Sequence, residues 1–288
     1  MKFISTQKVK GATQVVFIFG HPLGHTLSPA MHNAAFEKLH MPWLYAPLDI
    51  LPREVGAAVK MMKAFNIRGA NVTVPYKEEF LSYLDFIESE AKWMGSVNTI
   101  YRKGDKLCGT STDGEGFLIS LGAWRSKLKG TRGLLIGAGG AAKAVAGALA
   151  KAGVKGFMVA DISREKTVKI KTLIGQRYPK IDVQAIPAQD AVKFVPYSDW
   201  IIQATPLGLK GEVSPVSLKK ARKGVLAVDL IYHRQTDFLR QAERYGLLPL
   251  NGLGMLLNQG VLSFERWTGK KAPVEVMRKA LIKGLKSH

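Results

Sequence analysis

The segment 69–79 places polar and charged side chains where a buried strand would end. It reads Gly-Ala-Asn-Val-Thr-Val-Pro-Tyr-Lys-Glu-Glu, so Asn71 and Thr73 are two residues apart and point to the same face of a strand. Burying two polar side chains on one face costs free energy unless they find hydrogen-bond partners. We therefore expect this face to bind a polar ligand, with Lys77 in the loop that follows.

Other polar residues stand where predicted elements begin or end, namely Thr26, Ser28, Asn98 and Asp113. Ser28-Pro29 opens a predicted helix, in which the serine hydroxyl is expected to cap free N–H groups and the proline loses no hydrogen bond. Each of these residues, taken alone, is typical of a helix cap or a turn. Their role therefore depends on the wider pattern described below.

A glycine-rich segment indicates a second binding site, for a dinucleotide. Residues 134–142 read Leu-Leu-Ile-Gly-Ala-Gly-Gly-Ala-Ala, which fits Gly-x-Gly-x-x-Ala between a strand and a helix. Gly137 would form the tight turn, and Gly139 would let the backbone approach a pyrophosphate. The helix start, with Ala138, Gly140 and Ala141, would offer free N–H groups to phosphate.

An acidic residue follows this segment at a suitable distance. Asp161 lies 24 residues after Gly137, close to the spacing of the carboxylate that holds an adenosine ribose. A carboxylate there accepts hydrogen bonds from ribose hydroxyls and repels a 2′-phosphate, which favours NAD. In the alternative interpretation Asp161 caps the next helix, and Arg164 and Lys166 stand near enough to attract the 2′-phosphate of NADP.

The elements that would position these residues alternate between strands and helices. Apolar runs and helical spacing predict strands at 14–20, 43–48, 69–74, 106–110, 132–137, 155–160, 182–186, 199–204 and 225–229, and helices near 28–39, 55–65, 139–152, 163–177, 237–245, 254–267 and 274–285. The last two helices follow the second group of strands, so we expect them to pack back on the first domain.

The composition is that of a globular protein with an excess of positive charge. The chain has 288 residues, 47% hydrophobic and 22% charged, with a net charge of +20. Its basic residues are scattered, so we expect neither nucleic acid nor a membrane as a partner. The absence of a signal-peptide core and the single Cys108 favour a cytoplasmic protein without disulfides.

Six ordered motifs together resemble the shikimate dehydrogenase family over nearly the whole chain. They are His25-Thr-Leu-Ser-Pro29, Gly69-Ala-Asn-Val-Thr-Val-Pro-Tyr-Lys77, Gly95-Ser-Val-Asn-Thr99, Ser111-Thr-Asp-Gly114, Gly137-Ala-Gly-Gly-Ala141, and Asn251-Gly-Leu-Gly-Met255 with Gln259. The resemblance implies an α/β protein of two domains. A substrate domain of residues 1–112 would be completed by 253–288, and a doubly wound, Rossmann-type NAD(P) domain would span 113–252.

The resemblance also implies roles for individual residues. Lys77 and Asp113 match the catalytic pair, which moves the proton of the C3 hydroxyl while hydride passes between C3 and the nicotinamide. The sequence leaves open which of the two is the formal base. The implied substrate ligands are Thr26, Ser28, Asn71, Thr73, Asn98, Tyr232 and Gln259. The implied cofactor ligands are Gly137, Ala138, Gly139, Gly140, Ala141, Asp161, Ile162, Ser163, Lys166, Thr205 and Gly252.

The chain departs from the family pattern at several positions. Thr26 replaces the usual serine, and its methyl group would narrow the pocket for the substrate carboxylate. Members that use NADP usually carry Asn-Arg-Thr-x-x-Arg where this chain has Asp161-Ile-Ser-Arg-Glu-Lys166, and lysine cannot form the planar clamp of arginine. This strengthens the NAD hypothesis and places the chain nearer the quinate/shikimate branch. Ser111 replaces a common asparagine, with no consequence that we can assign.

Several alternatives stay open or carry less weight. A non-catalytic ligand sensor on this fold would have lost Lys77 or Asp113, and both are present. A glutamyl-tRNA reductase-like enzyme would need a nucleophilic cysteine, which Cys108 in a predicted strand does not resemble. We expect no metal site, because Pro22 and Gly24 interrupt the segment that carries His21, His25 and His32. An aminoshikimate-type substrate, and a monomer or a homodimer, remain open.

Overall fold

The chain forms two compact units. The computed structural model describes residues 11–24 and 26–286, so His25 and the basic segment before Gly11 lie outside the described residues. The first unit contains the chain up to Thr112 and again from Gln259, and the second unit contains Asp113–Asn258. The division falls inside helix α9 (Leu253–Thr268), whereas the sequence placed the return to the first domain at residue 253.

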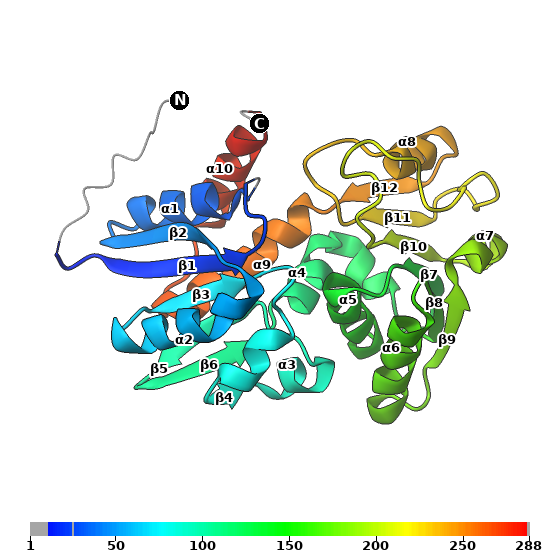
Figure 1. Ribbon diagram of the computed structural model, residues 1–288. Helices are drawn as coiled ribbons and strands as arrows, with labels where there is room; N and C mark the ends of the chain where they lie inside the picture. The colour runs from blue at the N-terminus through cyan, green and yellow to red at the C-terminus, as the bar shows by residue number, and fades with distance from the viewer. Residues whose placement is uncertain (1–10, 25, 287–288) are drawn as a thin grey trace. The chain divides into compact units, whose positions relative to one another are not determined.

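Strands and helices alternate along both units, and Figure 1 shows their arrangement within each. The strands are β1 (Gln14–Gly20), β2 (Trp43–Asp49), β3 (Gly69–Val72), β4 (Phe86–Ile87), β5 (Thr99–Lys103), β6 (Lys106–Thr110), β7 (Arg132–Ile136), β8 (Gly156–Asp161), β9 (Asp182–Pro187), β10 (Trp200–Gln203), β11 (Leu226–Asp229) and β12 (Leu248–Asn251). The helices are α1 (Ser28–Lys38), α2 (Val55–Ala64), α3 (Ser89–Met94), α4 (Asp113–Ser120), α5 (Gly140–Lys151), α6 (Arg164–Arg177), α7 (Ala191–Phe194), α8 (Asp237–Arg244), α9 and α10 (Val274–Lys286).

The first unit is built on a mixed sheet with the order β2-β1-β3-β5-β6-β4. β1 is parallel to both β2 and β3, and β5 is antiparallel to β3 and β6. The carboxyl ends of β1, β3 and β6 and the amino end of β5 therefore lie at the same edge of this sheet. The loops that contain Thr26, Lys77, Asn98 and Thr112 all leave or enter the sheet at that edge.

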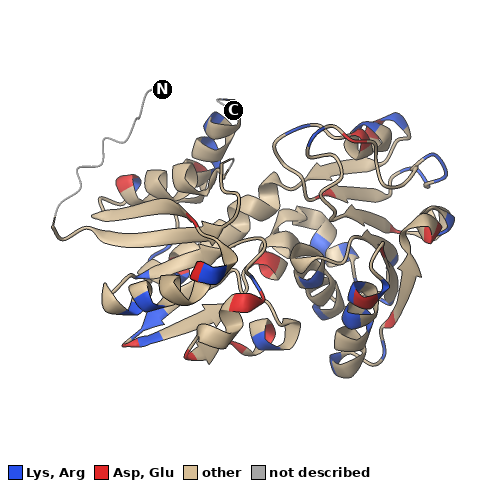
Figure 2. Ribbon diagram, viewed as in Figure 1, with Lys and Arg blue, Asp and Glu red and all other residues tan. Residues whose placement is uncertain are grey.

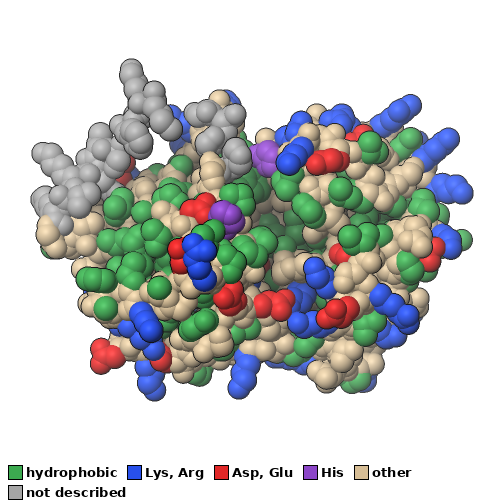
Figure 3. Space-filling model, in the orientation of Figure 1, with side chains coloured by type: hydrophobic (Ala, Val, Ile, Leu, Met, Phe, Trp, Pro, Cys, Tyr) green, Lys and Arg blue, Asp and Glu red, His purple; other side chains and the backbone are tan. Residues whose placement is uncertain are grey.

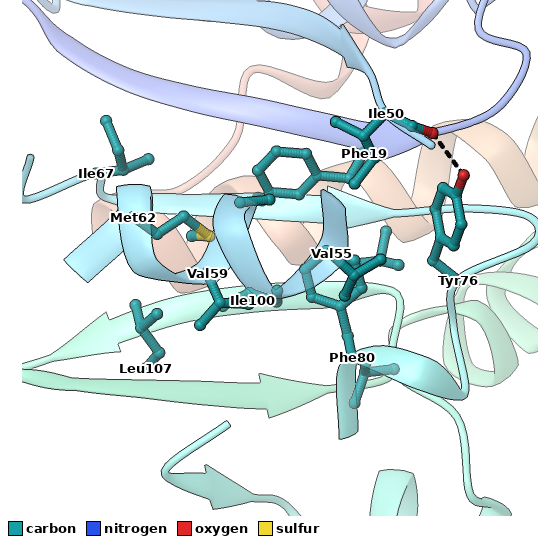
Figure 4. Packing of buried hydrophobic residues seen from close by; sticks show 14 of the residues in the cluster. Phe19, Ile50, Val55, Val59, Met62, Ile67, Tyr76, Phe80, Ile100 and Leu107 are labelled. Atoms are coloured by element: carbon teal, nitrogen blue, oxygen red, sulfur yellow. Dashed lines mark hydrogen bonds between the residues drawn. The ribbon is translucent and has the colours of Figure 1, made fainter. Parts of the chain in front are cut away.

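Helix α2 covers one face of this sheet with a continuous apolar core. Val55, Val59 and Met62 recur at helical spacing and are buried against Phe19 and other side chains of the sheet. Figure 4 shows these side chains converging between the helix and the strands. Burial of this kind stabilises a fold by about 1.5–3 kcal/mol for each large apolar side chain.

On another part of the first unit, α1 packs along α10 and the core is aromatic. His32 of α1 is fully buried, and its ring stacks on Tyr45 with centroids 4.5 Å apart. Phe264 and Trp267 of α9 lie beside the same imidazole. Neither ring nitrogen of His32 has a hydrogen-bond partner, and burial lowers the pKa of His32 to about 3.

The expected cap of α1 is wrong in detail. The helix begins at Ser28 with Pro29 in its first turn, but the capping position is Leu27 and no side chain caps the helix. The Ser28 backbone N–H instead points to the Thr26 hydroxyl oxygen at 3.4 Å. The Ser28 hydroxyl therefore does not cap its own helix and can contact other groups.

The second unit is a parallel sheet with the order β12-β11-β10-β7-β8-β9. Every neighbouring pair in it is parallel. If β7 is counted as strand 1, this is the 3-2-1-4-5-6 order of the dinucleotide-binding fold. The sequence prediction of a doubly wound, Rossmann-type unit is thus confirmed.

Basic residues occur on both units of the fold. Lysines and arginines are spread over the helices and loops of both units (Figure 2), and Figure 3 shows them separated by apolar and uncharged groups on the viewed face. Among the described residues, no helix is long and apolar enough to span a membrane.

Candidate active site

The first half-site lies where β1 and β3 leave the sheet of the first unit. The chain turns from β1 through α1 to β2 on one side and reaches β3 on the other, so the two loops diverge at a topological switch point, where open α/β sheets bind ligands. Gly20 and Thr73 meet there so closely that a Cβ at Gly20 would lie 2.4 Å from the Thr73 methyl group. The half-buried Thr73 therefore has a fixed place beside the loop that carries Thr26 and Ser28.

Lys77 stands in the loop after β3, four residues beyond Thr73. Its side chain is half-buried, and its backbone carbonyl accepts a hydrogen bond from the Val97 N–H at 2.8 Å. The preceding Tyr76 is buried and its hydroxyl donates to the Ile50 carbonyl (Figure 4). These contacts hold Lys77 next to the segment that carries Asn98.

The Tyr45 phenol connects two of the predicted substrate residues. Its hydroxyl donates to Asn71 Oδ1 at 2.8 Å, and the Ser28 side chain hydrogen-bonds the same phenol. Burial raises the pKa of Tyr45 well above its usual range, against the smaller opposite effect of Ser28. The phenol therefore stays neutral and serves as a hydrogen-bonding bridge.

The Asn71 side-chain amide contacts other protein groups, although the sequence suggested that it faces a ligand. Its Nδ2 lies within hydrogen-bonding distance of the Asn98 carbonyl, Thr99 Oγ1 and Ser263 Oγ, at 3.0, 3.3 and 3.1 Å. With Oδ1 facing Tyr45, both ends of the amide contact protein groups.

Asn98 and Gln259, predicted to bind the same substrate, do lie together. Asn98 Nδ2 donates to Gln259 Oε1 at 3.3 Å and to Thr112 Oγ1 at 2.9 Å. Asn98 Oδ1 accepts from the Thr112 N–H at 2.8 Å and from the Thr99 hydroxyl at 2.9 Å. All of these side chains are buried.

Sequence analysis missed the groups that support this cluster, namely Tyr45, Thr99, Thr112 and Ser263. The signal available was adjacency: Thr99 follows Asn98, Thr112 precedes Asp113, and Ser263 lies one helical turn after Gln259. Nothing in the sequence joins them, because the Asn71–Ser263 contact spans 192 residues.

The loop between β1 and α1 is anchored by hydrogen bonds to Asp49. His21 Nδ1 lies 2.6 Å from Asp49 Oδ1, and the Leu23 N–H donates to Asp49 Oδ2 at 3.0 Å. Both contacts lower the pKa of the Asp49 carboxyl. His21 therefore supports the loop, while His32 belongs to the aromatic core and His25 lies outside the described residues.

The second half-site lies at the switch point of the parallel sheet, between β7 and β10. Gly137 follows β7 with a φ of 106°, and a Cβ there would lie 2.8 Å from the Ala204 carbonyl oxygen and 3.1 Å from the Thr205 methyl group. Only glycine accommodates both constraints. The structure thus places predicted cofactor residues Gly137 and Thr205 side by side.

The glycine loop leads into α5 with its N–H groups available to an anion. Gly139 occupies the cap position, Gly140 begins the helix, and the first turn has no acidic residue. A Cβ added to Gly139 would meet no atom within 4 Å, so packing does not require glycine there. The open space and the positive helix end fit a pyrophosphate, with Ala141 in the first turn. The expected free N–H of Ala138 is not found, because it donates to Asp161 Oδ2.

Asp161 ends β8 and contacts this loop. Its Oδ2 accepts from the Ala138 N–H at 2.7 Å and its Oδ1 from the Ser163 N–H at 2.8 Å. Ser163, not Asp161, caps α6, through Lys166 N. Next to them the Ile162 side chain is 95% exposed.

The remaining predicted residues of the second unit are Asp113, Tyr232 and Gly252. Asp113 is buried at the first position of α4, and Gly114 behind it packs closely on the Ala144 carbonyl of α5. Tyr232 follows β11 in a loop held by buried Asp229, which accepts from the Ile231 N–H and the Thr236 hydroxyl. Gly252 lies against the Leu230 backbone, too close for a Cβ.

A surface hollow elsewhere in the second unit is a poorer candidate. It is lined by Arg132, Lys155, Asp199 and Arg222 at the amino ends of the parallel strands. Arg132 pairs with Asp182 and Arg222 with Asp199, so most of its charge is compensated. Dinucleotides bind at the opposite, carboxyl end of such sheets.

Comparison with known proteins identifies the family of this chain. The model of the shikimate dehydrogenase substrate binding domain matches residues 18–100, and that of the shikimate 5′-dehydrogenase C-terminal domain matches residues 252–282. A shikimate dehydrogenase (NADP(+)) of Carboxydothermus hydrogenoformans is 40% identical, covering 95% of this chain and 98% of the relative. The chain belongs to the shikimate dehydrogenase family.

Solved structures of family members have the same fold. A Listeria monocytogenes shikimate 5-dehydrogenase, in complex with shikimate and NAD, is 32% identical with a TM-score of 0.88, covering 96% of this chain and 99% of that one. A Thermus thermophilus shikimate 5-dehydrogenase, in complex with NADP(H) and shikimate, is 34% identical with a TM-score of 0.83, covering 94% and 99%. The family thus includes complexes with either dinucleotide.

Proposed function

We propose that this chain catalyses reversible hydride transfer between a nicotinamide dinucleotide and C3 of shikimate or quinate, with 3-dehydroshikimate or 3-dehydroquinate as the oxidised partner. The observation that carries the proposal is the buried cluster of Asn98, Gln259, Asn71 and Ser28 at the edge from which Lys77 leaves. Such a cluster suits a small acid with several hydroxyls, because a wrong substrate would leave buried polar groups unpaired.

Lys77 and Asp113 carry the proton chemistry in this proposal. The bound nicotinamide supplies the position that accepts hydride from C3 or returns it. Lys77 Nζ takes the C3 hydroxyl proton during oxidation and gives it back during reduction. Asp113 orients the lysine or shares that proton.

The other residues bind and orient the substrate. Ser28 and Thr26 hold its carboxylate, with Tyr232 near the same group, and Asn98, Gln259 and Thr73 hydrogen-bond the ring hydroxyls. Asn71 acts through the neighbouring groups, since its Nδ2 is directed to Asn98, Thr99 and Ser263. The methyl group of Thr26 narrows the carboxylate pocket and biases the choice among related acids.

For the cofactor, we propose NAD in preference to NADP. Asp161 stands at the end of β8 with its carboxylate at the glycine loop, where it accepts from ribose hydroxyls and repels a 2′-phosphate. Ile162 offers no charge to such a phosphate, and Lys166 offers a point charge in place of a planar clamp. The relatives named shikimate dehydrogenase (NADP(+)) count against this preference, so the cofactor needs a direct test.

The test is a four-way kinetic matrix: kcat/KM for shikimate and quinate, each with NAD and NADP, followed by nicotinamide absorbance. We expect turnover with a preference for NAD, and the better acid identifies the branch. A strong preference for NADP would defeat the assignment of Asp161 while leaving the dehydrogenase activity intact. No turnover with any pair would shift the proposal to an aminoshikimate-type substrate or to a ligand sensor. A cytoplasmic location and a monomeric or homodimeric state stay predictions.

A further inference from the structure

Thr112 makes two hydrogen bonds to Asn98, one of the residues proposed to bind the substrate. It follows β6 and is 5% exposed. Its N–H donates to Asn98 Oδ1 at 2.8 Å, and its Oγ1 accepts from Asn98 Nδ2 at 2.9 Å. One residue thus engages both ends of one amide.

This double contact fixes which way the Asn98 amide points. Turning the amide by 180° would set its NH₂ group against the Thr112 N–H, leaving two donors facing each other. The Thr99 hydroxyl, which donates to Asn98 Oδ1 at 2.9 Å, favours the same orientation. Asn98 Nδ2 is therefore directed toward Gln259 Oε1, 3.3 Å away.

Thr112 is also the residue that immediately precedes Asp113 in the chain. The bond from its N–H to Asn98 fixes the backbone just before the proposed catalytic carboxylate. Ser263 Oγ lies 3.2 Å from Thr112 Oγ1 and donates to the Gln259 carbonyl at 2.9 Å. The Thr112 hydroxyl is therefore connected, through the Ser263 hydroxyl, to the backbone of Gln259.

We infer that Thr112 is a positioning residue for the dehydrogenase reaction: it orients the Asn98 amide toward Gln259 and the substrate, and holds the chain that leads into Asp113. This inference rests on the proposed function for its kinetic consequences. The orientation of Asn98 does not depend on that function and is measurable separately.

Thr110 offers a matched control two residues earlier. It is also 5% exposed, and its hydroxyl donates to Glu88 Oε2 at 2.8 Å. Thr110 meets Asn98 through its backbone carbonyl, which accepts from the Asn98 N–H at 3.1 Å, and valine keeps that carbonyl while removing an equally buried hydroxyl. Thr110→Val therefore measures what the loss of such a hydroxyl does to folding alone.

The kinetic experiment compares Thr112→Val, Thr112→Ser and Thr110→Val in the full-length enzyme. We expect Thr112→Val to raise KM for the hydroxy acid and lower kcat, each about tenfold, because a buried amide loses a partner and its fixed orientation. KM for the dinucleotide should not change. Thr112→Ser should restore both constants to within about twofold, and Thr110→Val should lower thermal stability only.

A second measurement is independent of activity. The Asn98 side-chain amide signal in ¹H–¹⁵N spectra, assigned through its loss in Asn98→Asp, should shift and exchange faster in Thr112→Val than in Thr110→Val. An unchanged signal in Thr112→Val overturns the inference, even if the wild type turns over neither acid and the proposed function fails. An active wild type whose Thr112→Val variant loses only thermal stability, as Thr110→Val does, overturns it as well.

Discussion

The two half-sites of this enzyme use opposite means at equivalent places in their sheets. Both lie at the carboxyl ends of parallel strands, at the topological switch point where the strand order reverses. In the first unit, the groups proposed to bind the ligand are side chains held by other side chains, as in the bonds from Asn98 to Thr112 and Gln259. In the second unit, the proposed ligand contacts come from backbone N–H groups, and Gly137 and Gly139 leave the space that a side chain would fill. A site that recognises one small acid needs side-chain chemistry, whereas a site for phosphate needs only N–H groups and space.

The largest effect on kcat is expected from removing the Lys77 ammonium group in the first half-site. Lys77→Ala should lower kcat by about 10²–10⁴-fold, the range that general acid–base catalysis contributes. Dinucleotide affinity should not change, because the glycine loop belongs to the second unit. Steady-state kinetics and titration of dinucleotide fluorescence check both parts. Unchanged turnover in this variant would remove Lys77 from the mechanism.

The complementary change fills the space at Gly139. Gly139→Val should raise KM for the dinucleotide by about 100-fold, since a side chain there blocks the approach of a pyrophosphate. The fold should tolerate it, because a Cβ at this position meets no atom within 4 Å. Thermal unfolding and dinucleotide titration check this, and a large loss of stability would contradict the interpretation of Gly139 as open space.

A smaller effect is expected from neutralising Asp161 in the second half-site, which tests its role in choosing between NAD and NADP. Asp161→Asn removes the charge and keeps one oxygen, so the loop keeps one of its two hydrogen bonds from the Ala138 and Ser163 N–H groups. We expect the ratio of kcat/KM with NAD to that with NADP to fall by about tenfold. Thr167→Val, which removes a buried α6 hydroxyl that donates to the Arg164 carbonyl, is the control and should leave the ratio unchanged. An unaltered ratio in Asp161→Asn would mean that the carboxylate only closes the turn.

The smallest effect on activity is expected from the aromatic core under the first half-site. His32 has a pKa of about 3 in the folded protein against 6.5 in the unfolded chain. Between these values the unfolded chain binds a proton that the folded protein does not, so stability falls as pH falls, by about 1.4 kcal/mol per pH unit. His32→Phe should remove this part of the slope. Urea unfolding from about pH 7 to pH 4 checks it, and parallel curves for both proteins would contradict it.

Most of the fold was accessible from local sequence patterns. The run Gln14–Gly20 is β1 as predicted, and Trp43 begins β2, because apolar runs and turn residues act locally. Six short elements were missed, namely β4, α3, β5, α4, α7 and β12. The predicted strand 69–74 ends at Val72, since Thr73 turns toward Gly20.

The site could be predicted only in outline. Motifs located the candidate ligands, but the partners that orient them come from distant segments, such as Ser263 beside Asn71. The cap assigned to Ser28 was wrong for the same reason, because the side chain finds Tyr45 from another element. Hydrogen bonds between remote elements leave no periodic trace in a sequence.

The division of the first unit between both ends of the chain constrains how the protein is made. Residues 113–258 form one uninterrupted unit, so they can fold while synthesis continues. The earlier segment lacks Gln259, Ser263 and Trp267, whose Nε1–H donates to the Ile100 carbonyl, until the residues after the second unit have been synthesised. The first unit is thus completed only after the second, against the usual order. A chain released at residue 258 should resist protease across its second unit and be cut within its first.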